Sequence, residues 1–464
     1  MAVKISFGDS LAGLLIDGKE DTPFVVSTLT YSESRGIRIE VPYVHGVESD
    51  QFNEPDAWFD TATPPKNLGF VTRGGIISLF GCRYSGHSMA MGHGYSVGVI
   101  VPESVVLQSA GEDLGNELKV SRLKSEIDGI AEWSQLRSLK YIPESDESGR
   151  LTKFTVTAES PEKLDWTQGD ATLTIANNWE TFKSGPGIMV SEWGSLESEF
   201  PEPRTISEHL TEQRKFISLL TLIFGRAIRF RRHYVYDERF SERDLSGRPM
   251  GSSYYGLISA QTYRDHAQPK LDPKDLRDGI ASMSEIGKDG LSQWNSIHHQ
   301  WKRAIHPTVS ALSRPGAEVE NLVVNAAISL EAAGNLIGPV NGEQSTLNKG
   351  KATTATFVFR CLAASGIDFS KVSENPSGLA RAISTNYNTI KHFNRGEFPR
   401  ASESYFASQA SLLTIRILMA NLAKFGSVVT PHFINSRTLN DLESICRLHD
   451  IFVDGSGAFI PYPS

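Results

Sequence analysis

The sequence predicts an α+β protein in which a β-rich N-terminal domain precedes an all-α helical bundle. Over roughly the first 115 residues apolar side chains alternate with polar ones, as Ile37, Ile39 and Val41 do with the residues between them. Beyond residue 204 apolar side chains recur every three or four residues instead. The two patterns meet at 197–204, a stretch that contains Pro201 and Pro203.

Short alternating segments, separated by glycine and proline, predict the strands of the N-terminal domain. Between them, apolar and charged residues mix at helical spacing over 118–139, which predicts one helix there. We therefore expect an α+β domain over 1–204 with strands at 24–32, 37–41, 75–84, 95–107, 154–157 and 171–175.

The helical part, 205–464, is predicted to open with a capping box, because Thr205 and Glu208 have the spacing that such a box needs. Apolar stripes with steps of three and four then predict further helices. The irregular stretch 237–317 reads as an insertion or a linking helical segment. The stripes lie at 210–224, 322–333, 357–364 and 405–422.

Composition restricts the protein class. With 464 residues, 39% of them apolar and 22% charged, the chain is expected to fold into several globular cores. Its longest apolar stretches, such as 216–223, are too short for a membrane helix, and the N-terminus lacks the pattern of a signal peptide. The three cysteines are far apart without CxxC spacing, which favours a reducing cytoplasm. We expect a cytoplasmic protein that does not bind membranes.

Charge is unevenly distributed within the net charge of −8. Acidic residues outnumber basic ones in 1–204, and the reverse holds in 205–464, so a polyanion is expected to contact the second part. The basic cluster Arg226–His233 suits either phosphate contacts or an exposed strand edge, because Ile228 and Phe230 alternate with arginines.

No motif for a cofactor or a metal is recognisable, since the sequence has neither a P-loop nor HExxH. His298 and His299 lie in 294–301, a segment that can form a helix with aromatic and basic faces. A lone His-His pair on a helix is more often a surface or core feature than a metal site. The sequence therefore predicts neither a cofactor nor a bound metal.

The richest polar cluster is 384–395, with the sequence STNYNTIKHFNR. Asn388 and His392 are spaced four residues apart and would share one face of a helix. An imidazole can transfer protons near neutral pH and a neighbouring cation can stabilise a phosphate in the transition state, so the cluster suits phosphodiester chemistry. Lys391, His392 and Arg395 could equally complement the dipole at a helix C-terminus, and residue types alone favour this second interpretation.

The helical part resembles a HEPN domain of the type found in ApeA proteins of bacterial anti-phage defence. The resemblance covers 320–426, including ENLVV, SLEAA, a threonine-rich helix start at 353, YNTIKHF, and a final segment with Arg416. The β-rich half resembles the N-terminal domain that accompanies this HEPN type, through its Gly-rich pattern at 69–86, the helix end near Trp133, LDW at 164–166 and the segment from Arg204.

The resemblance implies a metal-independent endoribonuclease with an Arg-x(4–6)-His motif, assembled from two copies of the chain. On that reading His392 matches the motif histidine and Asn388 the polar residue after the arginine. The arginine position holds Tyr387, so the positive charge would come from Lys391, Arg395 or Arg416. The implied catalytic residues are His392, Asn388, Lys391 and Arg395, and the implied RNA-binding residues are Arg416, Arg381, Asn386 and Tyr387.

Two functional hypotheses stay open. The first is a defence endoribonuclease that cleaves tRNA or phage RNA as a homodimer or higher homo-oligomer, with the N-terminal domain sensing a phage protein or another trigger. The second is a HEPN protein without catalysis, acting as a sensor or as a binding and dimerisation module, which Tyr387 favours. A metabolic enzyme with a pocket in the β-rich domain is a third reading, but no cofactor motif supports it.

Overall fold

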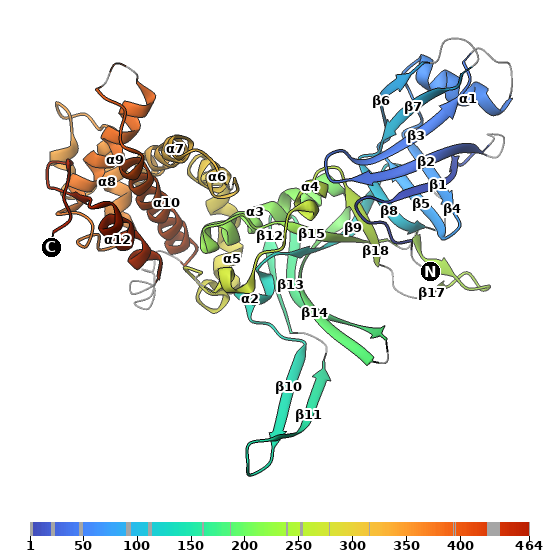
Figure 1. Cartoon of the computed structure of the whole chain (residues 1–464), viewed down its shortest axis with the longest axis horizontal. Helices are drawn as coiled ribbons and strands as arrows, with labels where there is room; N and C mark the ends of the chain where they lie inside the picture. Colours follow the sequence, from blue (N-terminus) through green and yellow to red (C-terminus); the bar gives the residue numbers. More distant parts are fainter. Residues whose placement is uncertain are drawn as a thin grey trace. The chain divides into compact units, whose positions relative to one another are not determined.

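The computed structural model describes residues 3–19, 24–45, 50–89, 94–109, 114–159, 162–185, 187–237, 240–250, 254–277, 279–314, 316–392, 394, 396–424 and 437–463. It divides into two compact units (Figure 1). The sheet unit consists of 1–130, 136–213 and 229–270, and the helical unit of 131–135, 214–228 and 271–464. A large antiparallel sheet followed by a helical region confirms the α+β class.

The sheet unit is built on one 14-stranded sheet with the order β12-β13-β14-β9-β15-β18-β8-β5-β4-β1-β2-β3-β7-β6. Its strand pairs are antiparallel. The strands are β1 (Ser10–Ile16), β2 (Val25–Ser32), β3 (Gly36–Tyr43), β4 (Asn67–Thr72), β5 (Gly75–Phe80), β6 (Arg83–Ser88), β7 (Ser96–Val101), β8 (Ser104–Ser109), β9 (Lys119–Ile127), β12 (Lys163–Gln168), β13 (Ala171–Ser184), β14 (Gly187–Thr205), β15 (Phe230–Tyr236) and β18 (Tyr254–Ser259).

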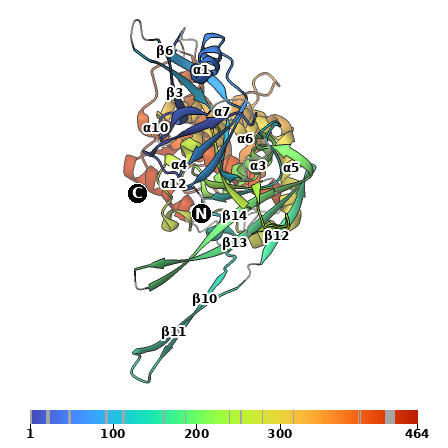
Figure 2. The same cartoon turned by 90° about the vertical axis from the view of Figure 1, so that its right-hand side faces the viewer.

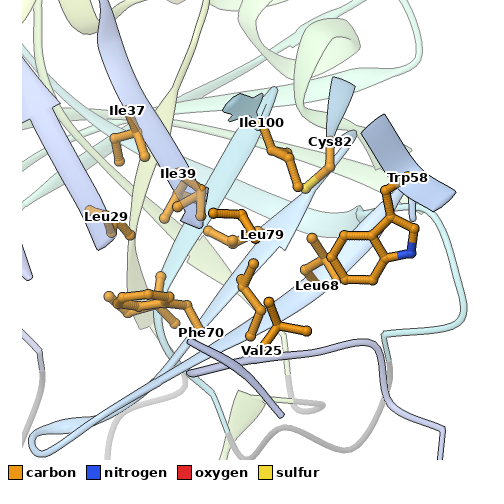
Figure 3. Close-up of a cluster of buried hydrophobic side chains, with 14 of the residues drawn as sticks. Val25, Leu29, Ile37, Ile39, Trp58, Leu68, Phe70, Leu79, Cys82 and Ile100 are labelled. Carbon is orange, nitrogen blue, oxygen red and sulfur yellow. The ribbon is translucent and has the colours of Figure 1, made fainter. Parts of the chain in front are cut away.

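The alternating sequence produces the core of this sheet. In β2 every second residue from Val25 to Tyr31 is buried, and β3 buries Ile37, Ile39 and Val41. Phe70 on β4 lies fully buried in the same cluster, and truncating it to alanine would cost about 3–5 kcal/mol. Figure 3 shows part of this cluster, with side chains from several strands and from α1 (Asp50–Asp60) pointing toward one another.

Two hairpins extend the sheet unit. The strands β10 (Leu139–Ser145) and β11 (Leu151–Ala158) form a separate two-stranded sheet, and β13 continues into β14 through a long hairpin. Figure 2 shows both hairpins reaching away from the rest of the sheet unit. A short pair, β16 (Glu242–Arg243) with β17 (Pro249–Met250), and the helix α4 (Tyr263–Ala267) complete the unit.

Two expectations for this half are wrong. Residues 118–139 form β9 and the short helix α2 (Ile130–Ser134) rather than one helix. Val120, Leu123 and Ile127 are spaced like a helical stripe. In β9, however, Leu123, Ser125 and Ile127 are buried on one face and alternate with the charged residues 122, 124 and 126, which is the period of a strand. The β structure also continues past 204, because β15 and β18 join the sheet after α3 (Ile206–Phe224).

The capping box predicted at the start of α3 is confirmed. The backbone N–H of Thr205 donates to Glu208 Oε2 at 2.9 Å, and the backbone N–H of Glu208 donates to Thr205 Oγ1 at 3.3 Å. Residues of α3 through 213 belong to the sheet unit and those from 214 to the helical unit. The helix therefore begins in one unit and ends in the other.

The helical unit is a bundle whose helices follow the predicted stripes. In it α7 packs against α6, α8 and α10, and α9 packs against α8. Gly334 of α7 allows close contact with α8, because a Cβ atom there would lie 2.3 Å from the carbonyl oxygen of Phe357. The helices are α5 (Met283–Gln300), α6 (Lys302–Leu312), α7 (Val319–Ile337), α8 (Thr354–Ser365), α9 (Pro376–Lys391), α10 (Ala401–Ala423) and α12 (Arg437–His449).

Small elements connect these helices. They are the 3-10 turns η2 (Pro273–Leu276) and η3 (Glu343–Thr346) and the strand pair β19 (Phe452–Val453) with β20 (Phe459–Ile460). The stretch 237–317 is thus part strand, part turn and part helix. Of the helices described, α10 alone is long and apolar enough to cross a membrane, and 89% of its most apolar window is buried inside the protein, as expected of a core helix.

Candidate functional site

The segment 384–392 forms the last turns of α9. Asn375 caps the start of this helix by accepting a hydrogen bond from the backbone N–H of Gly378 at 2.8 Å, and Pro376 occupies the first helical position. The helix ends at Lys391, and His392 is its C-cap with φ −123° and ψ 101°. The polar cluster 384–395 therefore includes a helix C-terminus, which the interpretation of Lys391 and His392 as groups that complement the helix dipole requires.

His392 stands where the chain leaves the helix. Its backbone N–H still donates to the carbonyl oxygen of Asn388 at 3.0 Å, but its extended backbone no longer follows the helix. The residue is half-buried, so part of its surface is open to solvent. Asn388 and His392 are therefore joined by the last helical backbone hydrogen bond, but the backbone of His392 is no longer helical, so the two side chains need not share one helix face.

The side chain of Asn388 is turned toward its own helix. Its Nδ2 donates to the carbonyl oxygen of Ser384 at 2.8 Å and lies 3.3 Å from the hydroxyl of Ser384. Asn388 is half-buried, and its Oδ1 atom can still accept a hydrogen bond from an incoming group. Ser384 therefore positions the Asn388 side chain. It was not identified from the sequence as a site residue, although it lies in the polar cluster.

Tyr387, at the position of the expected arginine, belongs to the core. It is 3% exposed and packs with Val323 and Ala327 of α7. The ammonium of Lys391 lies 3.2 Å from the Tyr387 hydroxyl and 5.2 Å from the centre of its ring. The Lys391 ammonium is thereby held against Tyr387, the residue at the position of the motif arginine.

Asn386 links α9 to α10. It is buried, and its Nδ2 donates to the hydroxyl of Ser404 at 3.2 Å. Its Oδ1 atom is buried without a hydrogen-bond partner in the part of the chain that the structure describes. This buried hydrogen bond joins α9 to α10, which favours a structural role for Asn386.

The remaining expected site residues are elsewhere or not described. Arg381 is on an earlier turn of α9, where its guanidinium donates to the carbonyl oxygens of Gly455 at 3.2 Å and Ser345 at 2.5 Å. Arg395 lies outside the described residues. The structure therefore brings Tyr387, Asn388, Lys391 and His392 together at one helix end, without Arg381.

Arg416 is buried within α10 and satisfies the C-terminus of α3. Its Nε donates to the carbonyl oxygen of Leu222 at 2.7 Å, and one terminal nitrogen donates to that of Ile223 at 3.0 Å. Burial lowers the pKa of Arg416 to about 10, with a smaller contribution from Arg226. An RNA phosphate could reach this guanidinium only if it left those carbonyls, so we leave Arg416 out of the proposed site.

The basic cluster Arg226–His233 is engaged in contacts with acids and hydroxyls. Arg226 pairs with Asp275 at 3.2 Å. Both nitrogens of His233 have partners, since Nδ1 lies 2.7 Å from the Ser125 hydroxyl and Nε2 2.8 Å from that of Thr262. The expected strand is present as β15, but it lies between β9 and β18 rather than at an edge. These contacts favour a structural role over phosphate binding for Arg226 and His233.

Metal ligands do not gather in the described part of the chain, where no group of three or more His, Cys, Asp or Glu residues could hold an ion. His298 on α5 has its pKa lowered to about 4 by burial and then by His306, whose ring centre lies 5.3 Å away. The two imidazole rings are tilted by 52° to one another, and neither is part of the site on α9.

Comparison with known proteins gives one match. The model of the family "ApeA N-terminal domain 1" matches residues 15–294, which is more than half of the chain. No curated protein and no solved structure matches it. The matched range covers the sheet and extends into α5, and it ends before α9. The chain therefore belongs to the ApeA family of anti-phage defence proteins.

Proposed function

We propose that the protein is a metal-independent endoribonuclease of anti-phage defence, and that the end of α9 is its active site. The observation that carries this proposal is the half-buried His392 at the C-cap of α9, which follows Lys391 in the sequence and donates its backbone N–H to the carbonyl oxygen of Asn388. The substrate would be RNA, either tRNA or phage RNA. The sheet unit would sense the phage trigger, because the family match covers most of that unit and ends within α5, before α9.

The chemistry follows from the three side chains. In strand cleavage by internal attack, the 2′-hydroxyl of one nucleotide forms a bond to the adjacent phosphorus, and the bond from phosphorus to the 5′-oxygen of the next nucleotide breaks. His392 would take the proton of the 2′-hydroxyl or return one to the leaving oxygen. Lys391 would stabilise the negative charge on the phosphorane. Asn388 would position the substrate, either by donating an Nδ2 hydrogen to a phosphate oxygen or by accepting from a ribose hydroxyl at Oδ1.

Two copies of this helix end would complete the site. One histidine cannot easily serve as base and acid on opposite sides of the same phosphorus. A symmetric dimer that brings the ends of two α9 helices together would supply a second His392, a second Lys391 and, from the segment after the helix, Arg395. We therefore propose that the active form is a homodimer or a higher homo-oligomer.

A second candidate is a binding module without catalysis, which the surroundings of Tyr387 favour. This tyrosine is buried where the motif requires a guanidinium, and Lys391 already contacts its hydroxyl and its ring. If that contact holds Lys391 away from the phosphate, the helix end can bind RNA or a second copy of the chain without cleaving RNA.

The experiment that separates the two candidates is cleavage of total RNA and of tRNA by the purified full-length chain in the presence of EDTA. For a nuclease, His392→Ala should lower the rate by about a hundred- to ten-thousandfold, which is typical of losing a general acid or base. His299→Ala is the matched control, because His299 is an exposed histidine on α5. RNA binding without cleavage by the unmodified chain would favour the binding module, whereas cleavage that His392→Ala leaves unchanged would refute the assignment of this site.

A further inference from the structure

The sheet unit contains a cavity of about 540 Å³ that none of the site residues above touches. Residues 3–7 form one wall, and the others come from β2, β8, β15, β18 and α4. The volume is within the range of about 300–1,000 Å³ that is usual for small-molecule sites. The cavity is thus large enough for a metabolite.

Two residues of the wall have polar atoms without partners. Tyr31 is 4% exposed, and its hydroxyl has no hydrogen-bond partner among the described residues. The Nε2 atom of His266 is likewise buried and without a partner in that part of the chain. Natural proteins rarely leave such atoms unsatisfied. Both atoms are covered in the free chain, so a molecule in the cavity is expected to bond to them after a small rearrangement of the wall.

The protonation states of Tyr31 and His266 determine which ligand groups they can bind. Burial, and then the nearby Arg231, lowers the pKa of His266 to about 4, so its ring is neutral at pH 7. Burial raises the pKa of Tyr31 far above its ordinary value, so its hydroxyl stays protonated. Each group can therefore donate or accept one hydrogen bond from a neutral partner such as a heterocyclic ring.

Aromatic and apolar side chains form much of the remaining wall. Phe7 packs against Tyr31 with ring centres 4.3 Å apart, and Tyr234 and Leu107 also line the cavity. A flat ring would contact these surfaces favourably through stacking. The wall therefore favours a planar heterocycle over a sugar or a peptide.

The charges of the wall are divided between an occupied arginine and two exposed cations. The five N–H groups of Arg231 are engaged by Asp128 and by the carbonyl oxygens of Asp265, Gln268 and Pro269. Lys4 and Arg232 are exposed and line the same cavity, and the Nε atom of Arg232 also lies 3.4 Å from Glu126 Oε2. An anionic group is thus expected at the exposed cations rather than at Arg231.

We propose that this cavity binds a nucleotide, with the base among the rings and bonded to Tyr31 and His266, and the phosphate near Lys4 and Arg232. A nucleotide combines a planar heterocycle that carries donors and acceptors with an anionic group, as the wall requires. The proposal deepens the sensing role proposed for the sheet unit, since it names the chemical class that the unit would detect.

The test is calorimetric titration of the full-length chain, without RNA, with AMP, GMP, CMP and UMP. Adenosine, which lacks phosphate, and ribose 5-phosphate, which lacks a base, are the comparison ligands. We expect at least one nucleotide to bind more tightly than both comparison ligands. Because no RNA is present, the result does not depend on whether the chain cleaves RNA, and failure of this proposal is distinguishable from failure of the nuclease proposal.

Tyr31→Phe removes only the unpartnered hydroxyl. We expect it to leave the melting temperature of the free chain unchanged or higher, and to weaken nucleotide binding about tenfold, as for the loss of one hydrogen bond. His266→Leu should weaken binding similarly, and Tyr95→Phe, at an exposed tyrosine, is the matched control. The proposal is overturned if no nucleotide binds, or if the affinity of Tyr31→Phe and His266→Leu equals that of the unmodified chain.

Discussion

Replacing Asp128 with alanine should cost the sheet unit about 3–5 kcal/mol of its free energy of unfolding, because it breaks a buried ion pair. The side chains of Asp128 and Arg231 are only 6% and 5% exposed, and the carboxylate accepts from Nε at 2.7 Å and from a terminal nitrogen. The variant leaves a charged guanidinium inside the protein with two N–H groups unpaired. Neighbouring carbonyls already occupy its other N–H groups and cannot replace the carboxylate.

Hydrogen exchange of peptides from β9 and β15 measures this cost in the sheet unit alone. The matched control is Glu144→Ala, which breaks the pair of Glu144 with Lys153 on the β10–β11 hairpin. Their side chains are 51% and 61% exposed, so this loss should be about 0–1 kcal/mol. If Asp128→Ala destabilised the sheet unit no more than Glu144→Ala does, the reasoning about the buried pair would be wrong.

Three further predictions concern stability. In the unfolded chain His298 takes up a proton below pH about 6.5, whereas folding lowers its pKa to about 4. The free energy of unfolding of the helical unit should therefore fall as the pH is lowered from about 6.5 to about 4. In urea unfolding, the free energy of unfolding of His298→Gln should depend less on pH than that of the unmodified chain. Gly225→Ala should cost at least about 1–2 kcal/mol in urea unfolding, because Gly225 has φ +69° and a Cβ atom would lie 2.5 Å from Cζ of Arg416. Gln213→Leu should cost about 1–3 kcal/mol in thermal or urea unfolding, because the Gln213 amide joins α3 to β9 and β14 through buried hydrogen bonds.

Periodicity predicted the fold where one face of an element is buried. Strands β2 and β3 and the helices α7 and α8 have one clear apolar pattern each, and the structure confirms them. Helix α10 is confirmed as well, although it is buried on almost all sides. Strand β9 was missed because Val120, Leu123 and Ile127 also fit a helical stripe and the polar Ser125 interrupts the apolar alternation. The place of β15 was missed because pairing partners such as His233 and Leu257 lie far apart in the sequence, and local pattern does not define register over that distance.

The sequence could predict only those parts of the candidate site whose residues lie close together in the chain. The sequence placed Asn388, Lys391 and His392 within one turn, and the helix end preserves that proximity. It could not show that Arg416 is used to cap α3, since the two elements are almost two hundred residues apart. The cavity walls come from six separate segments, so no short motif indicated Tyr31 or His266. The resemblance of the N-terminal half to ApeA proteins is confirmed by the family match.

The most direct test of the account is the chemistry of the RNA ends that the purified full-length chain produces in EDTA. Attack by the 2′-hydroxyl with His392 transferring protons predicts fragments that end in 2′,3′-cyclic phosphate and 5′-hydroxyl groups, formed by the unmodified chain and by His299→Ala but not by His392→Ala. Fragments with 3′-hydroxyl and 5′-phosphate ends, or the same cyclic ends in equal yield from His392→Ala, would contradict the account.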